Sequence, residues 1–249
     1  MHFKEYVGRL RTRKAHIYCI GAAKTGTTSI AQMYNGALRT AHEPNVEQTT
    51  QMVMDYLSGG INKEKCREML ISRDRKLNLE LESSHPLGYL APFLMDAFPK
   101  AKFIVTVREP HSWLASRLNF HLNRKPDEWA DYRDFIWSRH HQGYSEEEFC
   151  LEEKGLYSLS AYLKQYSEQY QIIFDAIPES RMLVIKTNEL SDMTNELGHF
   201  IGIKDECIAA VHTNKMRVPE SIYDQLPKDF IVEKIEHHCG WLVNRFFRA

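Results

Sequence analysis

The chain of 249 residues is 43% hydrophobic and 26% charged, which is ordinary for a globular protein with one large core. Its formal net charge of −1 excludes a general attraction to nucleic acid or to an anionic membrane. No apolar run approaches the roughly 20 residues that span a bilayer, and the N-terminus has no signal-peptide pattern. The 5 cysteines are scattered without CxxC spacing, which favours reduced thiols in a cytoplasmic location. We expect one domain over residues 1–249, without a membrane or nucleic-acid partner.

Short apolar segments alternate with helical patterns along the chain. Buried strands are expected as short apolar runs, and helices as apolar residues that recur every three or four positions. In chain order, the first elements predicted are a strand at 15–20, a glycine-containing loop at 21–29, a helix to about residue 38, the end of a strand at 39–44, a helix at 46–57, a break at 58–62 and a polar helix at 63–71. Strict alternation at 77–82 predicts a further strand, with Glu80 and Glu82 on a solvated face.

The second half of the chain continues the same alternation. The elements predicted there are an apolar helix at 89–98, a buried strand at 101–107, a helix from about residue 112, an irregular aromatic segment at 123–150, a long helix at 157–177, a strand at 181–186, a helix from residue 196, a loop at 212–219 and a closing helix at 230–247. Strands that alternate with helices are typical of a parallel sheet covered on both faces. We therefore expect a three-layer α/β/α fold with a central, mostly parallel sheet.

The ends of the predicted strands, and the residues just after them, are rich in groups that bind anions or move protons. They are the loop at 21–29, His42, Glu43, His85, Arg108 and Lys186. Ligands of parallel α/β folds bind at this edge, where the strands end. In the loop, glycine allows a tight turn, and backbone N–H groups and the start of a helix then point towards an anion. Lys24 adds a positive charge to the loop, and Thr27 and Thr28 add hydroxyl donors.

The loop differs from the phosphate loop of nucleoside triphosphatases. In that GxxxxGK[ST] motif the lysine directly follows the second glycine, whereas here Thr27 follows Gly26 and the lysine lies two residues earlier, at Lys24. Those enzymes also use an aspartate at a strand end to help hold Mg²⁺. The buried strands at 101–107 and 181–185 lead instead into basic residues, Arg108 and Lys186. The sequence therefore predicts an anion site that needs no metal.

Three motifs resemble those of one enzyme family. Lys24-Thr-Gly-Thr-Thr28 is similar to the P-loop-like loop with which PAPS-dependent sulfotransferases bind the 5′-phosphosulfate of 3′-phosphoadenosine 5′-phosphosulfate (PAPS). Val105-Thr-Val-Arg108-Glu-Pro110-His-Ser-Trp-Leu-Ala-Ser116 resembles the family's strand, arginine, proline and serine-bearing helix. Ser84-His-Pro-Leu resembles the stretch with the histidine base in cytosolic members. The chain departs from the family at Ser29, where cytosolic members often have tryptophan, and at 187–189, which lacks the tyrosine of many members.

The resemblance implies a role for each matching residue. Lys24 neutralises charge on the leaving oxygen, and His85 is the general base, because imidazole suits proton transfer near neutral pH. Glu43 is the rival base, since some members of the family use a glutamate. The residues expected to bind the donor are Ala23, Lys24, Thr25, Gly26, Thr27, Thr28, Ser29, Arg108, Ser116, Lys215 and Arg217. Arg108 and Ser116 bind the 3′-phosphate in this interpretation, with Lys215 and Arg217 as further candidates.

Two other features bear on the substrate and on metals. The segment at 119–150 is expected to cover the acceptor, because long irregular segments of compact domains often form lids or binding loops. His140-His141 and His237-His238-Cys239 have no second cluster at ligand spacing, so we expect no bound metal.

The sequence thus favours in-line, metal-free transfer of a sulfuryl group from PAPS to a hydroxyl, or less readily an amine, of a small metabolite or natural product. Two other functions remain open. One is a kinase that uses ATP or GTP and Mg²⁺, and the other is a non-catalytic nucleotide-binding module with the same fold. Neither the acceptor nor the oligomeric state follows from the sequence.

Overall fold

The computed structural model describes residues 12–123, 128–203 and 221–248. The predicted loop at 212–219, with the candidates Lys215 and Arg217, lies outside the described residues. The chain divides into two compact units. The first is drawn from Met1–Val107 and Ile172–Thr213, and the second from Arg108–Gln171 and Asn214–Ala249.

The first unit is built on a five-stranded sheet in the order β2-β3-β1-β4-β5. Every adjacent pair of these strands is parallel, which confirms the predicted α/β class. The strands are β1 Ile17–Cys19, β2 Thr40–His42, β3 Leu81–Ser83, β4 Lys102–Val107 and β5 Met182–Lys186. Each lies within or beside a segment predicted as a strand, because short apolar runs between polar turns can be buried on both faces.

The register of the sheet brings the ends of its central strands level with one another. Cys19 of β1 lies beside Ser83 of β3 and Ile104 of β4, and Ser83 in turn lies beside His42 of β2. Residues that follow β1, β2 and β3 therefore emerge at the same edge of the sheet. This adjacency positions the candidate site described below.

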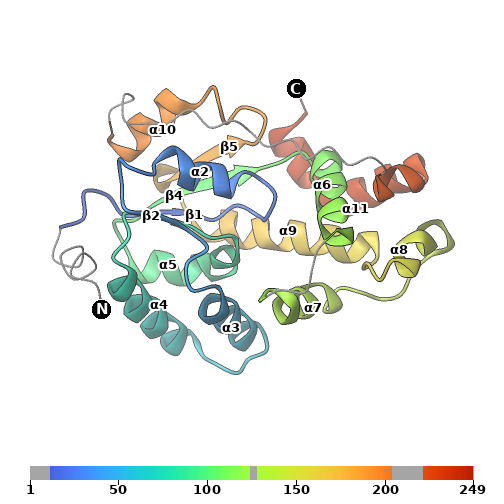
Figure 1. The fold of residues 1–249 in the computed structure, drawn as a ribbon, viewed down its shortest axis with the longest axis horizontal. Coiled ribbons are helices and arrows are strands. Elements are labelled where there is room, and N and C mark those ends of the chain that lie inside the picture. Colours follow the sequence, from blue (N-terminus) through green and yellow to red (C-terminus); the bar gives the residue numbers. More distant parts are fainter. Residues whose placement is uncertain (1–11, 124–127, 204–220, 249) are drawn as a thin grey trace. The chain divides into compact units, whose positions relative to one another are not determined.

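Helices cover both faces of the sheet in the first unit. In Figure 1, α2 and α10 lie on one side of the strands, and α3, α4 and α5 lie on the other. The first face packs α2 and α10 on Ile17, Ile104 and Ile185 in one hydrophobic cluster. The helices are α2 Thr27–Met33, α3 Val46–Leu57, α4 Lys63–Leu77, α5 Ala91–Ala97 and α10 Thr194–Ile201, with short 3₁₀ turns η1 His85–Leu90 and η3 Glu179–Arg181.

Helices joined by loops make up the described part of the second unit. Its elements are α6 Pro110–Leu122, α7 Ala130–Ser138, η2 Glu146–Glu148, α8 Phe149–Glu153, η5 Ile222–Gln225 and α11 Lys228–Phe246, and α9 Leu159–Ala176 begins in this unit. The prediction of an irregular segment at 123–150 is therefore wrong for α7 and α8. Tyr132 and Trp137 are buried there, so these aromatic side chains form core. These helices are short and rich in polar residues, so the apolar positions are too few to show the helical periodicity in the sequence.

The strand predicted at 77–82 is also wrong in its first half. Helix α4 continues to Leu77, and Asn78 ends it in the left-handed conformation with φ 47°. Strand β3 begins only at Leu81. Asparagine adopts this conformation more easily than most residues, which makes it a common helix C-cap. The alternating leucines and glutamates therefore belong to a helix end, a turn and a short strand.

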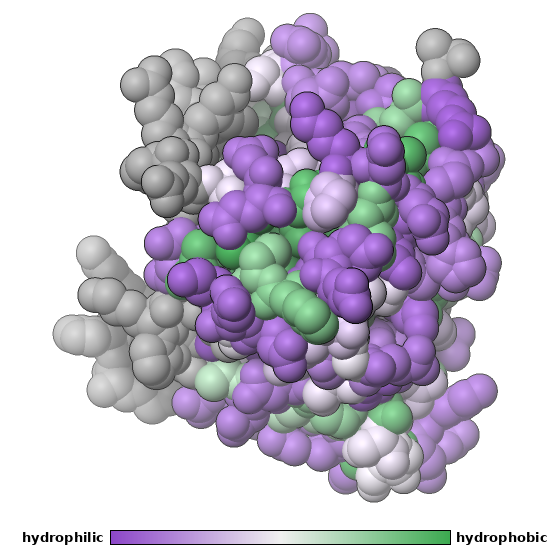
Figure 2. Space-filling view, turned by 90° about the vertical axis from the view of Figure 1, so that its right-hand side faces the viewer, coloured by the Kyte–Doolittle hydropathy of each residue, from purple (hydrophilic) through white to green (hydrophobic). Residues whose placement is uncertain are grey.

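Figure 2 shows a face on which hydrophilic residues surround a small hydrophobic area near its centre. Among the described residues, no helix is both long and apolar enough to cross a membrane. The four described cysteines, Cys19, Cys66, Cys150 and Cys239, form no disulfide with one another.

Candidate active site

The glycine-containing loop joins β1 to α2 and has an unusual backbone. Lys24 has φ 70° and Gly26 has φ 104°, so both residues are left-handed, and Lys24 has a side chain that disfavours this conformation. Strained residues of this kind persist where the surroundings fix them, and they concentrate at functional sites. Ala23, Lys24, Gly26 and Ser29 are half-buried, and Thr28 is exposed, so the loop borders solvent.

Buried hydroxyl groups fix the loop to the sheet. Thr25 Oγ1 donates to Ala22 O at 2.5 Å and lies 2.7 Å from Thr106 Oγ1 of β4. Thr187, the residue after β5, donates from Oγ1 to Thr25 O at 2.7 Å. The side chain of Thr25 is therefore buried and bonded within the protein. In the donor binding predicted for this residue, the group that takes part is its backbone N–H. These bonds hold the loop in one shape before any ligand binds.

The hydroxyls of Thr27 and Thr28 contact His42, a residue that the sequence analysis placed at a strand end but did not assign to the site. His42 Nε2 lies 3.3 Å from Thr27 Oγ1 and 3.1 Å from Thr28 Oγ1. Ser83 Oγ, also buried, donates to Thr27 O at 2.7 Å. Burial lowers the pKa of His42; the Glu43 carboxylate alone would raise this pKa, and His85 lowers it further. His42 is accordingly neutral near pH 7, when it can orient both threonine hydroxyls.

The two residues predicted as rival bases are in direct contact. Glu43 follows β2, His85 follows β3 one residue beyond Ser84, and His85 Nδ1 is hydrogen-bonded to Glu43 Oε1. An ionised carboxylate only accepts hydrogen bonds, so Nδ1 carries the proton of this bond. The imidazole Nε2 of the neutral ring is then left with a lone pair that can accept a proton. Glu43 also lies 3.8 Å from His42 Nε2, which links the pair to the loop.

The turn that carries Glu43 is itself strained. Glu43 has φ 50° and Asn45 has φ 53°, with Pro44 between them. Glu43 N donates to Ser83 O at 2.8 Å, which continues the pairing of β2 with β3 beyond the strand ends. This bond places the Glu43 side chain beside the segment that leads to His85.

The prediction that Glu80 and Glu82 lie on a solvated strand face is wrong. Both are buried. Glu80 accepts from the backbone N–H groups of Lys14 and Arg39 at 2.8 and 3.0 Å. Burial alone would raise the pKa of Glu80, but these bonds and the Arg39 charge outweigh it and lower the pKa. Glu82 pairs with Arg73 of α4, so neither carboxylate is bonded to His85 in the structure.

The second unit carries the residues predicted to bind the 3′-phosphate. Arg108 Nε donates to Ser112 Oγ at 2.7 Å, and the predicted Ser116 lies one turn later on the same helix. Tyr166 OH donates to Arg108 O at 2.6 Å, and its ring stacks on Trp113 with centroids 3.9 Å apart. Burial lowers the pKa of Arg108, which nevertheless stays charged at neutral pH. Ser116 is half-buried on the same helix, α6.

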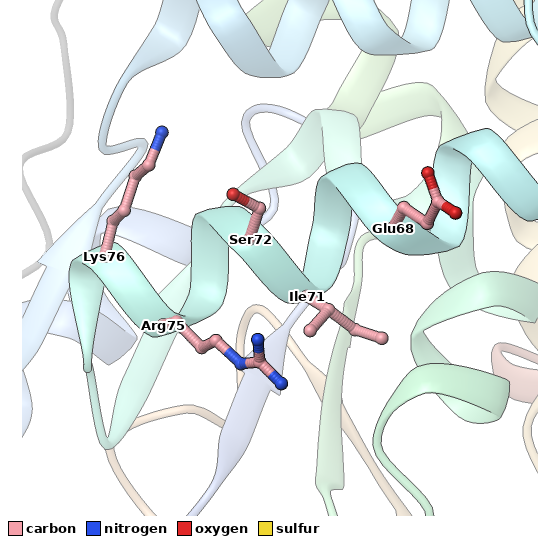
Figure 3. A pocket seen from close by; sticks show the side chains of 5 residues that line it. All are labelled: Glu68, Ile71, Ser72, Arg75 and Lys76. Carbon is pink, nitrogen blue, oxygen red and sulfur yellow. The ribbon is translucent and has the colours of Figure 1, made fainter.

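Two other features lie apart from these residues. Figure 3 shows a surface pocket of about 370 Å³ whose lining comes from one helix, α4: Glu68, Ile71, Ser72, Arg75 and Lys76. None of the predicted site residues lines this pocket. Within residues 12–123, 128–203 and 221–248, no three His, Cys, Asp or Glu side chains are grouped so that they could hold a metal.

Together, the fold and the loop define a P-loop-like α/β protein with an anion loop after its first strand. The sequence pattern of one family, the sulfotransferase domain, matches residues 16–203. No curated protein matches the chain's sequence. The chain therefore belongs to the sulfotransferase domain family, and its general activity is sulfuryl transfer.

Among the solved structures with a similar fold are two sulfotransferases. One is a sulfotransferase from Alicyclobacillus acidocaldarius, with 16% sequence identity and a TM-score of 0.50 over 96% of this chain and 98% of that one. The other is sulfotransferase STF9 from Mycobacterium avium, with 11% identity and a TM-score of 0.58 over 99% of this chain and 80% of that one. At these identities the likeness is one of fold.

Proposed function

We propose that this protein transfers the sulfuryl group of PAPS to a hydroxyl group of a small molecule, with Glu43 and His85 acting together as the base. The observation that carries the proposal is the contact between His85 Nδ1 and Glu43 Oε1, next to His42, which contacts Thr27 and Thr28 of the loop. The sequence treats Glu43 and His85 as alternatives. Their hydrogen bond supports a shared role, in which Glu43 fixes the tautomer and orientation of His85.

In the proposed reaction, one bond to sulfur forms while another breaks. The acceptor hydroxyl gives its proton to His85 Nε2 while its oxygen forms a bond to the sulfur of PAPS. The bond between sulfur and the bridging phosphate oxygen breaks, and 3′,5′-diphosphoadenosine leaves. Lys24 and the backbone N–H groups of 23–29 stabilise the negative charge that builds on the leaving phosphate. By analogy with phosphoryl transfer, positioning and electrostatics supply most of the rate.

The donor-binding residues remain those of the sequence prediction. The loop residues 23–29 bind the 5′-phosphosulfate, and Arg108 and Ser116 bind the 3′-phosphate. Ser112 joins this set because it shares a hydrogen bond with Arg108. Segment 119–150 contributes to acceptor binding. The net charge of −1 supports a small acceptor over a long polyanion, because the chain has no general attraction for anions.

A thermal-shift panel tests the donor. A ligand at 100 times its dissociation constant stabilises a protein by about 2.7 kcal/mol. We expect 3′,5′-diphosphoadenosine to raise the melting temperature without Mg²⁺, and ATP and GTP to have little effect. A larger effect of ATP or GTP with Mg²⁺ would replace this proposal with the kinase. Stabilisation by 3′,5′-diphosphoadenosine without sulfuryl transfer to any acceptor would favour the non-catalytic module.

Kinetics test the shared base. Groups that act as a unit give rate losses that do not add. We expect His85→Asn to lower kcat by about 10²- to 10⁴-fold, as for loss of a general base. Glu43→Gln should lower kcat less, and the double variant should be no slower than His85→Asn alone. Independent, multiplicative losses would show that the two residues act separately.

A further inference from the structure

One buried arginine of α4 contacts both chain segments that lead to the proposed base. Arg73 Nη2 donates to Pro44 O at 2.7 Å, and Nη1 donates to Glu82 Oε2 at 2.6 Å. Pro44 directly follows Glu43, and Glu82 lies three residues before His85. A single guanidinium therefore fixes the turn after β2 relative to the end of β3. Those are the two segments whose side chains meet in the hydrogen bond between Glu43 and His85.

Stability alone does not account for this ion pair. The side chains of Arg73 and Glu82 are 2% and 5% exposed. Buried ion pairs of this kind are often no more stabilising than apolar residues of the same size, because both charges lose their hydration. Here Arg73 Nε and Glu82 Oε1 have no hydrogen-bond partner among the described residues. Burial raises the pKa of the Glu82 carboxyl, although the charge of Arg73 acts to lower this pKa.

The turn that Arg73 holds needs such support. Glu43 is left-handed although its side chain disfavours this conformation, and Pro44 has no N–H group to donate. A strained turn of this kind persists only when several contacts determine it. Glu43 N bonds to Ser83 O, and Asn45 O accepts from Thr49. Between these two bonds, Pro44 O accepts from the side chain of Arg73, which belongs to α4 rather than to α3, the helix that follows the turn.

We propose that Arg73, paired with Glu82, is a positioning residue that holds the Glu43 carboxylate against His85 during sulfuryl transfer. This inference rests on the proposed function. Arg73 itself touches no reacting atom. Its effect on the rate comes from geometry, since a misplacement of about 1 Å in a catalytic group can cost about 10²-fold.

The test replaces both charges at once. Arg73→Met alone would leave the Glu82 carboxylate buried and unpaired, and the chain would fold poorly for that reason. The pair variant, Arg73→Met with Glu82→Met, removes both charges and keeps the volume. The matched control is Arg13→Gln with Asp74→Asn, which removes the ion pair between Arg13, before β1, and Asp74, the residue after Arg73 in α4 (2.8 Å); neither side chain is bonded to the turn at 43–45 among the described residues.

The kinetic result expected is a loss of kcat by about 10- to 100-fold in the pair variant, the range for residues that orient catalytic groups. The KM for PAPS and the binding of 3′,5′-diphosphoadenosine should change by less than about threefold, and the control should keep its kcat. When the pair substitutions are added to Glu43→Gln, kcat should fall by less than about twofold relative to Glu43→Gln alone. An equal loss in both backgrounds would overturn the inference, because Arg73 would then act independently of Glu43.

A second readout does not depend on turnover. The His85 Nδ1 proton, held by a carboxylate, gives a downfield NMR signal that exchanges slowly with water. We expect this signal in the wild-type protein and in the control, and its loss in the pair variant and in Glu43→Gln. Its retention in the pair variant would overturn the inference even if the wild-type protein fails to use PAPS. Failure of the wild-type protein with PAPS, with the signal behaving as expected, would overturn only the proposed function.

Discussion

Gly21, the first residue of the anion loop, has no room for a side chain. A Cβ atom at this position would lie 2.1 Å from Thr106 Oγ1, 2.3 Å from Thr106 O and 2.9 Å from Thr106 N. Non-bonded carbon contacts are normally about 3.5–4.0 Å. Two of the three obstructing atoms belong to the backbone of β4, which is hydrogen-bonded between β1 and β5 and cannot move freely. Gly21→Ala must therefore displace the loop or the strand.

The size of the effect follows from this geometry. Overpacking costs typically about 1–3 kcal/mol, and the backbone obstruction at Gly21 places this variant at about 3 kcal/mol. For a chain of this length, each kcal/mol lowers the melting temperature by about 2–4 °C. We expect Gly21→Ala to melt about 6–12 °C below the wild-type protein in calorimetry or circular dichroism. The stabilisation by 3′,5′-diphosphoadenosine should also shrink, because the loop moves.

Gly36→Ala is the matched control. Gly36 has φ 109° and nothing within 4 Å of an added Cβ, so this substitution introduces backbone strain without a clash. A left-handed non-glycine residue costs about 1–2 kcal/mol. The reasoning is refuted if Gly21→Ala melts within 2–3 °C of the wild-type protein, or above Gly36→Ala.

Three further predictions concern the second unit. Arg108→Ala should weaken PAPS and 3′,5′-diphosphoadenosine by a similar factor in calorimetric titrations, and unchanged affinity for both would remove Arg108 from the 3′-phosphate site. Tyr166→Phe leaves the backbone of Arg108 without its hydroxyl partner and should cost about 1–3 kcal/mol, read from denaturant unfolding; a cost near zero would contradict that contact. Burial lowers the pKa of His238 to about 4, so the unfolded chain binds its proton more readily. Stability should therefore fall as the pH drops below about 6.5 and level off below about 4, and His238→Gln should flatten that slope; an unchanged slope would exclude His238 as its source.

The order of strands and helices could be predicted from the sequence because it depends on local pattern. Short apolar runs gave the positions of β1, β4 and β5, and the spacing around Lys24 and Gly26 indicated the anion loop. The error at 77–82 shows the limit of this reasoning. Alternating leucine and glutamate predicts a solvated strand face, but Glu80 and Glu82 find partners at Arg39 and Arg73. Ion-pair partners that come from distant segments cannot be recognised in the local sequence pattern.

The hydrogen bond between Glu43 and His85 could not be predicted from the sequence for the same reason, because the two residues come from distant segments. Each residue could be placed after a strand, which made both of them candidates. Their contact depends on β2 lying directly beside β3, and strand order is set by the packing of the whole sheet. His42 was visible at the same strand end, but its hydrogen bonds to Thr27 and Thr28 also require that order.

The hydroxyl bonds that hold the anion loop have a consequence for protein engineering. Thr106, Thr187 and Ser83 come from three different segments, and each bonds to the loop or to its threonines. A nine-residue peptide grafted onto another α/β scaffold would carry Lys24 and the glycines but none of these supports. The smallest portable unit is therefore β1, β3, β4 and β5 with the loop attached, and a designer who wants this binding motif must transplant the sheet edge as a whole.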